Sequence, residues 1–140
     1  MDFNWFILSL LAAFAFGGMT LLFRIATDKG ISPVLGLFYI ILVATILLGV
    51  YNFSVEKSFV TSKNIIIILI IAGVFSFIGN TLLFKALGSA PNPGYAEAVG
   101  SLRILLITFI SILIFSLKLN LLGILGSIFV VIGIILLSMV

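Results

Sequence analysis

Long apolar runs, separated by short polar connections, make up most of this 140-residue chain. Five of the runs reach the length of about 17–25 mainly apolar residues that a membrane-spanning helix requires. They cover residues 4–26, 33–51, 65–87, 94–115 and 120–139. Because the runs are uninterrupted and too long for strands, they favour helices over a β-barrel. The pattern predicts an all-α integral membrane protein with five transmembrane helices in one domain, residues 1–140.

The overall composition supports a membrane protein and excludes several classes of site. The chain is 64% hydrophobic and 8% charged, whereas a soluble domain carries roughly a quarter charged residues. The absence of Cys and His excludes disulfides, zinc-finger sites and the Ser-His-Asp triad. The seven basic residues are spread singly and form no nucleic-acid-binding patch. We therefore expect the lipid bilayer as the main partner, and no catalytic residues, metal site, cofactor or nucleic-acid partner.

The positive charges give no preferred orientation in the membrane. Three lie near connections on one side and three on the other: Arg24, Lys29 and Lys85 against Lys57, Lys63 and Lys118. Orientation normally follows an excess of Lys and Arg in the cytoplasmic connections. Two interpretations stay open. Either the equal number of positive charges on the two sides is an accident of small numbers, or copies of the chain insert in both orientations and pair as an antiparallel dimer.

A stripe of polar residues follows one face of the fourth run. Glu97, Ser101, Thr108 and Ser111 fall within about 80° of one another on a helical wheel. Such a stripe either bonds to neighbouring helices or lines a wet cavity. Glu97 lies in the expected first turn, where a carboxylate is also favoured by the helix dipole. It is therefore either a structural anchor near the membrane surface or a functional acid.

Arg103 stands about 14 Å along the fourth run, near the middle of a hydrocarbon core about 30 Å thick. An arginine at this depth costs roughly 2.5–3.5 kcal/mol on insertion scales, so it needs a partner. Glu97 is the only acidic candidate at membrane depth, and Asn80 shares the depth of Arg103 in the hairpin of runs three and four. Counting residues in both directions from Pro91, in the turn of this hairpin, places Lys85 opposite Glu97. The sequence does not rank these pairings.

Small residues line one face of the first and of the fifth run. In the first run the face consists of Ser9, Ala13, Gly17, Thr20 and Arg24. In the fifth run it contains Gly123, Gly126, Ser127 and Gly133. Small residues allow helices to approach closely in lipid. They serve either packing within one protomer or, in the fifth run, a dimer contact.

The stretch LFKALGSAPNPGYA, residues 83–96, resembles the second half of an EamA-type domain, the unit of the drug/metabolite transporter superfamily. The Phe-Lys-Ala-Leu element that ends the third run and the glycines of the fifth run carry the resemblance. It extends loosely over nearly the whole chain. Two features depart from the family pattern: Tyr39 stands where an Arg is usual, and Leu117 stands where a turn Glu is usual.

This resemblance implies a fold in which two inverted five-helix units enclose a central cavity, so the chain would be one half of an inverted-repeat transporter fold. A chain with one unit would then pair with itself as a homodimer, most simply in antiparallel orientation. We predict a small transporter in the cell membrane that moves a small organic metabolite through the cavity, with proton coupling as a hypothesis. The expected substrate or coupling residues are Glu97, Arg103, Asn80, Ser101, Thr108, Thr20 and Arg24. The alternative is a non-transporting accessory subunit or half of a lipid-translocating heterodimer.

Overall fold

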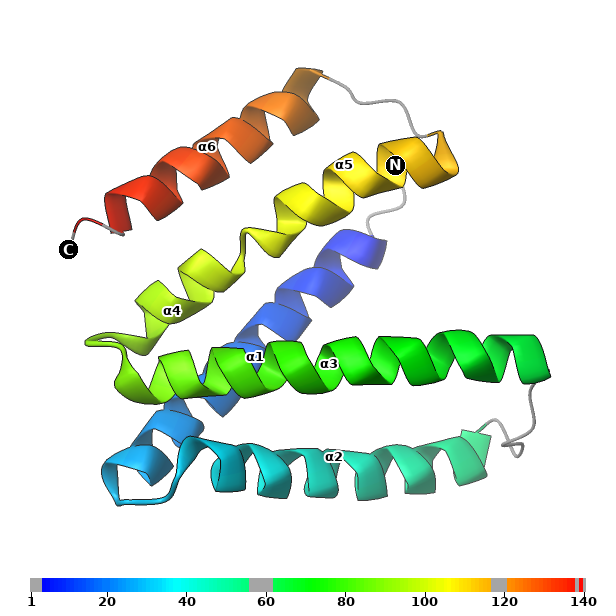
Figure 1. Ribbon diagram of the computed structural model, residues 1–140, viewed down its shortest axis with the longest axis vertical. Helices are drawn as coiled ribbons and strands as arrows, with labels where there is room; N and C mark the ends of the chain where they lie inside the picture. Colours follow the sequence, from blue (N-terminus) through cyan, green and yellow to red (C-terminus); the bar gives the residue numbers. More distant parts are fainter. Residues whose placement is uncertain (1–3, 56–61, 117–120, 138, 140) are drawn as a thin grey trace. The chain divides into compact units, whose positions relative to one another are not determined.

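The computed structural model describes residues 4–55, 62–116, 121–137 and 139 of the chain. Over these residues the protein is helical, without a β-strand, which confirms the predicted all-α fold. The helices in the described part are α1 (Asn4–Asp28), α2 (Pro33–Val55), α3 (Lys63–Ser89), α4 (Pro93–Gly100), α5 (Arg103–Phe115) and α6 (Leu121–Leu137) (Figure 1). They form two compact units, Met1–Ser89 and Ala90–Val140, named here the first and second unit.

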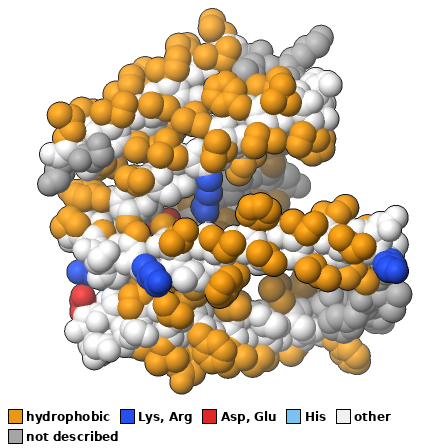
Figure 2. Space-filling model, viewed as in Figure 1, with side chains coloured by type: hydrophobic (Ala, Val, Ile, Leu, Met, Phe, Trp, Pro, Cys, Tyr) orange, Lys and Arg blue, Asp and Glu red, His pale blue; other side chains and the backbone are white. Residues whose placement is uncertain are grey.

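Four segments of the described chain are long and apolar enough to cross a membrane. They are Asn4–Asp28, Pro33–Val55, Lys63–Ser89 and Pro93–Phe115, and a shorter apolar helix, Leu121–Leu137, follows. Figure 2 shows hydrophobic side chains over most of the visible surface. Phe14, Phe53 and Phe75 are 73%, 74% and 73% exposed, which suits a surface that faces lipid. The protein is therefore an all-α membrane protein.

Several helices extend beyond the apolar runs, and polar side chains at their ends form hydrogen bonds or ion pairs within the helix. At the end of α1, Nε of Arg24 donates to Oδ1 of Asp28 at 3.0 Å, one helical turn away. At the end of α2, the Ser54 hydroxyl donates to the Val50 carbonyl at 2.9 Å. The helices thus continue through residues that the sequence assigned to a connection.

The buried residues of the first unit gather at one end, where α1 ends, α2 begins and α3 ends (Figure 1). They are Thr20, Phe23, Gly36, Leu37, Phe84 and Leu87. The rings of Phe23 and Phe84 meet edge to face with centroids 4.5 Å apart. A Cβ on Gly36 would lie 2.9 Å from the Phe23 ring, so this close approach requires glycine. We call this cluster the tip; toward the opposite ends of the helices the described side chains are largely exposed.

In the second unit the fourth span extends over Pro93–Phe115, and two turn residues, Ser101 and Leu102, separate its two helical segments, α4 and α5. α4 begins with Pro93, after Asn92 accepts a hydrogen bond from the Gly94 amide at 2.8 Å. It ends at Gly100, and α5 begins at Arg103. The Ser101 hydroxyl donates back to the Glu97 carbonyl at 3.0 Å. Such back-bonding bends helices, and a glycine just before it lowers the local helix propensity further.

Some sequence-based expectations fall outside the described residues. They concern the basic residues Lys57 and Lys118, the residue Leu117, and the expected N-cap Asn120.

Candidate functional site

Arg24 ties the end of α1 to the end of α3. Besides its ion pair with Asp28, its Nη1 donates to the carbonyl oxygens of Leu87 at 3.1 Å and Gly88 at 3.4 Å. These carbonyls lie in the last turn of α3, where the negative end of the helix dipole favours a cation. A Cβ on Gly88 would lie 2.8 Å from Cγ of Pro33, so glycine lets α3 end against the start of α2. Arg24 therefore has a structural role at the tip, and its predicted substrate role stays a prediction.

The other predicted polar residues of the first unit lie on α1 and α3. Thr20 is 6% exposed at the tip. The Asn80 side-chain amide donates to the Ser76 hydroxyl at 3.0 Å, within α3. Next to it, the hydroxyl oxygen of Thr81 is buried and has no hydrogen-bond partner among the described residues. Sequence analysis did not single out Thr81, because a lone threonine in an apolar run carries no distinguishing pattern.

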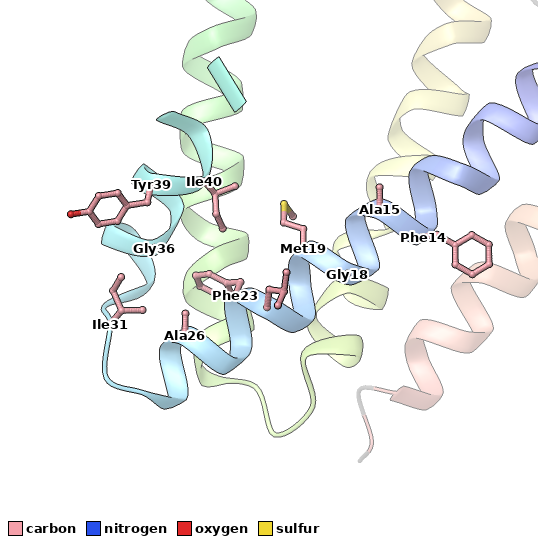
Figure 3. Close-up of a pocket in the computed structure, with 11 residues that line it drawn as sticks. Phe14, Ala15, Gly18, Met19, Phe23, Ala26, Ile31, Gly36, Tyr39 and Ile40 are labelled. Carbon is pink, nitrogen blue, oxygen red and sulfur yellow. The ribbon is translucent and has the colours of Figure 1, made fainter. Parts of the chain in front are cut away.

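A groove with a volume of about 590 Å³ lies between α1 and α2 (Figure 3). Its lining residues are apolar apart from one tyrosine: Phe14, Ala15, Gly18, Met19, Leu22, Phe23, Ala26, Ile31, Gly36, Tyr39 and Ile40. In Figure 3 the side chains of Met19 and Ile40 point toward each other across the groove, whereas the ring of Tyr39 points away from α1. The groove wall therefore offers hydrocarbon and almost no polar contact.

The groove lies on the face of α1 that sequence analysis passed over. Ala15, Gly18 and Leu22 line the groove, whereas Gly17 belongs to the small-residue face predicted for packing. At 100° per residue the centres of the two faces are about 180° apart. The only sequence signal for the groove is the pair of small residues Ala15 and Gly18 among large apolar side chains, and it is not specific.

Glu97, Ser101 and Arg103 lie in or beside the turn between α4 and α5 in the second unit. The Ser101 amide donates to the carbonyls of Glu97 and Ala98 at 3.0 and 3.1 Å, and the Leu102 amide donates to Val99 at 3.1 Å. The turn is thus tightened toward 3₁₀ geometry, which in the middle of a helix often marks a hinge. Glu97 is half-buried, and Arg103 is exposed as the first residue of α5.

The amide donors that follow this turn also shift to nearer carbonyls. The Ile104 amide donates to Ser101 at 2.9 Å and the Leu105 amide to Leu102 at 3.0 Å. An α-helix would direct these amides to Gly100 and Ser101 instead. Irregular backbone at membrane depth is tolerated only where it is buried in protein or lines a wet cavity. Here the four amides of Ser101, Leu102, Ile104 and Leu105 all keep a backbone acceptor within the span.

The remaining predicted positions of the second unit are Thr108 on α5 and the small residues of α6. Thr108 is half-buried. The Ser127 hydroxyl donates to the Gly123 carbonyl at 2.9 Å, within α6. A Cβ on Gly126 or Gly133 would meet no described atom within 4 Å. Neither glycine is needed for a close approach here, and their role in a dimer contact stays a prediction.

The pairings of Arg103 with Asn80 and of Glu97 with Lys85 join residues of different units, and they stay predictions. Among the described residues, no three acidic, histidine or cysteine side chains come together as a possible metal site.

Comparison with known protein families places the chain among membrane transporters. The model of the EamA-like transporter family matches residues 3–139, across both units. No match was found among curated proteins or among solved structures. The match agrees with the resemblance carried by residues 83–96, and it covers the groove, the tip and the fourth span.

Proposed function

The chain belongs to the EamA-like transporter family, and from this premise we propose that it moves a small organic metabolite through a cavity formed between two copies. The family consists of transporters rather than enzymes. In this proposal a second copy of the chain supplies the other five-helix half of the inverted pair. The evenly divided positive charges suit a partner that is the same chain in the opposite orientation.

The observation that carries this proposal is the tightened turn at Ser101 and Leu102 within the fourth span, Pro93–Phe115. Membrane transporters commonly place substrates and coupling ions at discontinuous helices near the middle of the bilayer. The positive charge of Arg103 favours an anionic group on the substrate.

An antiparallel pair would place two copies of Arg103 at similar depth, where their charges repel. An anionic substrate relieves this repulsion, and its affinity then depends on Arg103. Glu97 precedes Arg103 by six residues and is separated from it by the turn. We propose that Glu97 takes up and releases a proton as the cavity opens to either side, which couples transport to a proton gradient.

The experiment compares Arg103→Ala and Glu97→Gln with the unchanged protein in reconstituted vesicles. The probes are a panel of labelled small organic anions and cations, offered with and without a pH gradient. Arg103→Ala should abolish uptake of anions, whereas Glu97→Gln should leave a slow uptake that no longer responds to the gradient. Leu106→Ala, which truncates an exposed side chain on α5 and leaves every charge in place, is the matched control and should retain uptake.

The outcome that contradicts the proposal is uptake that is unchanged and equally sensitive to pH in both variants. If the unchanged protein transports no probe of the panel, whichever way it is oriented in the vesicles, the result would favour the accessory-subunit alternative.

A further inference from the structure

We propose that the groove between α1 and α2 binds an acyl chain of an anionic membrane phospholipid, whose phosphate lies at Lys29 and the start of α2. The proposal concerns a lipid that stays with the protein, and it does not depend on transport. It rests on the length of the groove, its lining, the rigidity of its base and the charge at its outer end.

The length of the groove suits one leaflet of a bilayer. Its residues on α1 extend from Phe14 to Ala26. Twelve residue steps at 1.5 Å correspond to about 18 Å along the helix. Half of a hydrocarbon core of about 30 Å is about 15 Å. An acyl chain that runs from the membrane surface toward the midplane therefore has the length of the groove.

The lining favours hydrocarbon over a polar ligand. A Cβ on Gly18 would meet no described atom within 4 Å, so the groove is open at this point. Met19 and Ile40 face each other across it, and the Tyr39 ring points away from α1 (Figure 3). A groove that is left empty forfeits the dispersion contacts of its walls, whereas a flexible chain fills it.

The base of the groove is formed by the tip and is held in place. Phe23 and Gly36 both line the groove and are buried. The Phe23 ring is fixed by its edge-to-face contact with Phe84. Arg24 then joins α1 to the last carbonyls of α3. The groove is therefore pre-formed, and a lipid does not have to order its walls.

Apolar contact alone does not select a lipid, because the surrounding acyl chains are equally apolar. Selection has to come from the headgroup end. The groove ends at Ala26 and Ile31, next to the connection that carries Asp28 and Lys29. Asp28 is paired with Arg24. Arg24, Asp28 and Lys29 together carry one net positive charge, and the exposed Lys29 presents it at this end of the groove.

The charge at this end sets the size of the expected preference. One basic residue near the membrane surface favours an anionic lipid by about five-fold over a zwitterionic lipid. The test is native mass spectrometry of delipidated protein after equal amounts of phosphatidylglycerol and phosphatidylcholine with the same chains have been added back. We expect one tightly held lipid, with phosphatidylglycerol preferred about five-fold.

Matched variants separate the groove from the rest of the surface. Gly18→Leu fills the groove and should remove the tightly held lipid, whereas Gly17→Leu, on the opposite face of α1, should not. Ala15→Leu and Ala13→Leu form a second such pair, in case Gly18→Leu does not fold; circular dichroism and thermal unfolding check each variant. Lys29→Gln should bring the two lipids to equal retention, and Lys63→Gln, at the start of α3, should not.

Three results would overturn the proposal. One is equal lipid retention in the groove-filling variants and their controls. Another is equal retention of the two lipids by the unchanged protein. The third is that the groove-filling variants change the ratio of monomer to dimer but not the amount of bound lipid. That result would mean that a protein segment occupies the groove.

Discussion

Replacement of Gly36 by alanine tests whether the tip is packed as closely as the structure indicates. The added Cβ would lie 2.9 Å from Cε2 and 3.3 Å from Cδ2 of the Phe23 ring. The ring is 2% exposed and lies against Phe84, with centroids 4.5 Å apart, so it has little room to move away. Overpacking of this kind costs about 1–3 kcal/mol. Against this, the change from glycine to alanine within a helix raises the free energy of unfolding by about 0.5–1 kcal/mol.

Gly49 provides the matched control, because it lies in the same helix and its Cβ would meet no described atom within 4 Å. Gly49→Ala should therefore raise the free energy of unfolding by about 0.5–1 kcal/mol. The two variants should differ by the packing cost alone, about 1–3 kcal/mol. At about 2–4 °C per kcal/mol for a chain of this size, Gly36→Ala should unfold at least 2 °C below Gly49→Ala. Thermal unfolding in one detergent, followed by circular dichroism, measures the difference. Equal midpoints, or a higher midpoint for Gly36→Ala, would refute the account of the tip.

Two further predictions concern Arg24 and the turn between α4 and α5. Arg24→Gln loses charged hydrogen bonds to the end of α3 and should lower the free energy of unfolding by about 1.5–3 kcal/mol. Asp28→Asn loses only an exposed ion pair and should lower it by less than about 1 kcal/mol. Equal losses of the two variants in thermal unfolding would contradict the capping role of Arg24. The double variant Gly100→Ala and Ser101→Ala should join α4 to α5, because alanine favours a continuous helix. Hydrogen exchange at the Ile104 amide should then become slower. Unchanged exchange would mean that the turn between the two segments has another cause.

The sequence predicts the number of spans well, because a bilayer imposes a minimum length of apolar residues on each of them. It predicts helix ends less well. α2 continues to Val55, beyond the apolar run, and the Ser54 hydroxyl there bonds to the Val50 carbonyl, a backbone atom that has no signature in sequence. The role of Arg24 at the tip escaped prediction for the same reason, since two of its acceptors are the carbonyls of Leu87 and Gly88.

The groove and the turn in the fourth span were not predicted, for different physical reasons. Ala15, Gly18 and Met19 are apolar or small, as residues that face lipid are, so their joint role appears only when α1 is placed beside α2. Gly100 and Ser101 are common in transmembrane helices that stay continuous. What distinguishes this turn is that the amides of Leu102, Ile104 and Leu105 donate to carbonyls three residues back, which has no signature in sequence.

The most direct test of the central claim, a transporter assembled from two oppositely oriented copies, is the orientation of the chain in the membrane. The chain contains no cysteine, so a single cysteine reports one position without background. Ser89→Cys and Ser62→Cys mark the ends of α3, which lie on opposite sides of the membrane, and neither removes a charge. A membrane-impermeant maleimide is applied to sealed cells that carry one variant or the other. The account predicts that about half of each variant is labelled. Complete labelling of one variant and full protection of the other would show a single orientation and contradict the antiparallel homodimer.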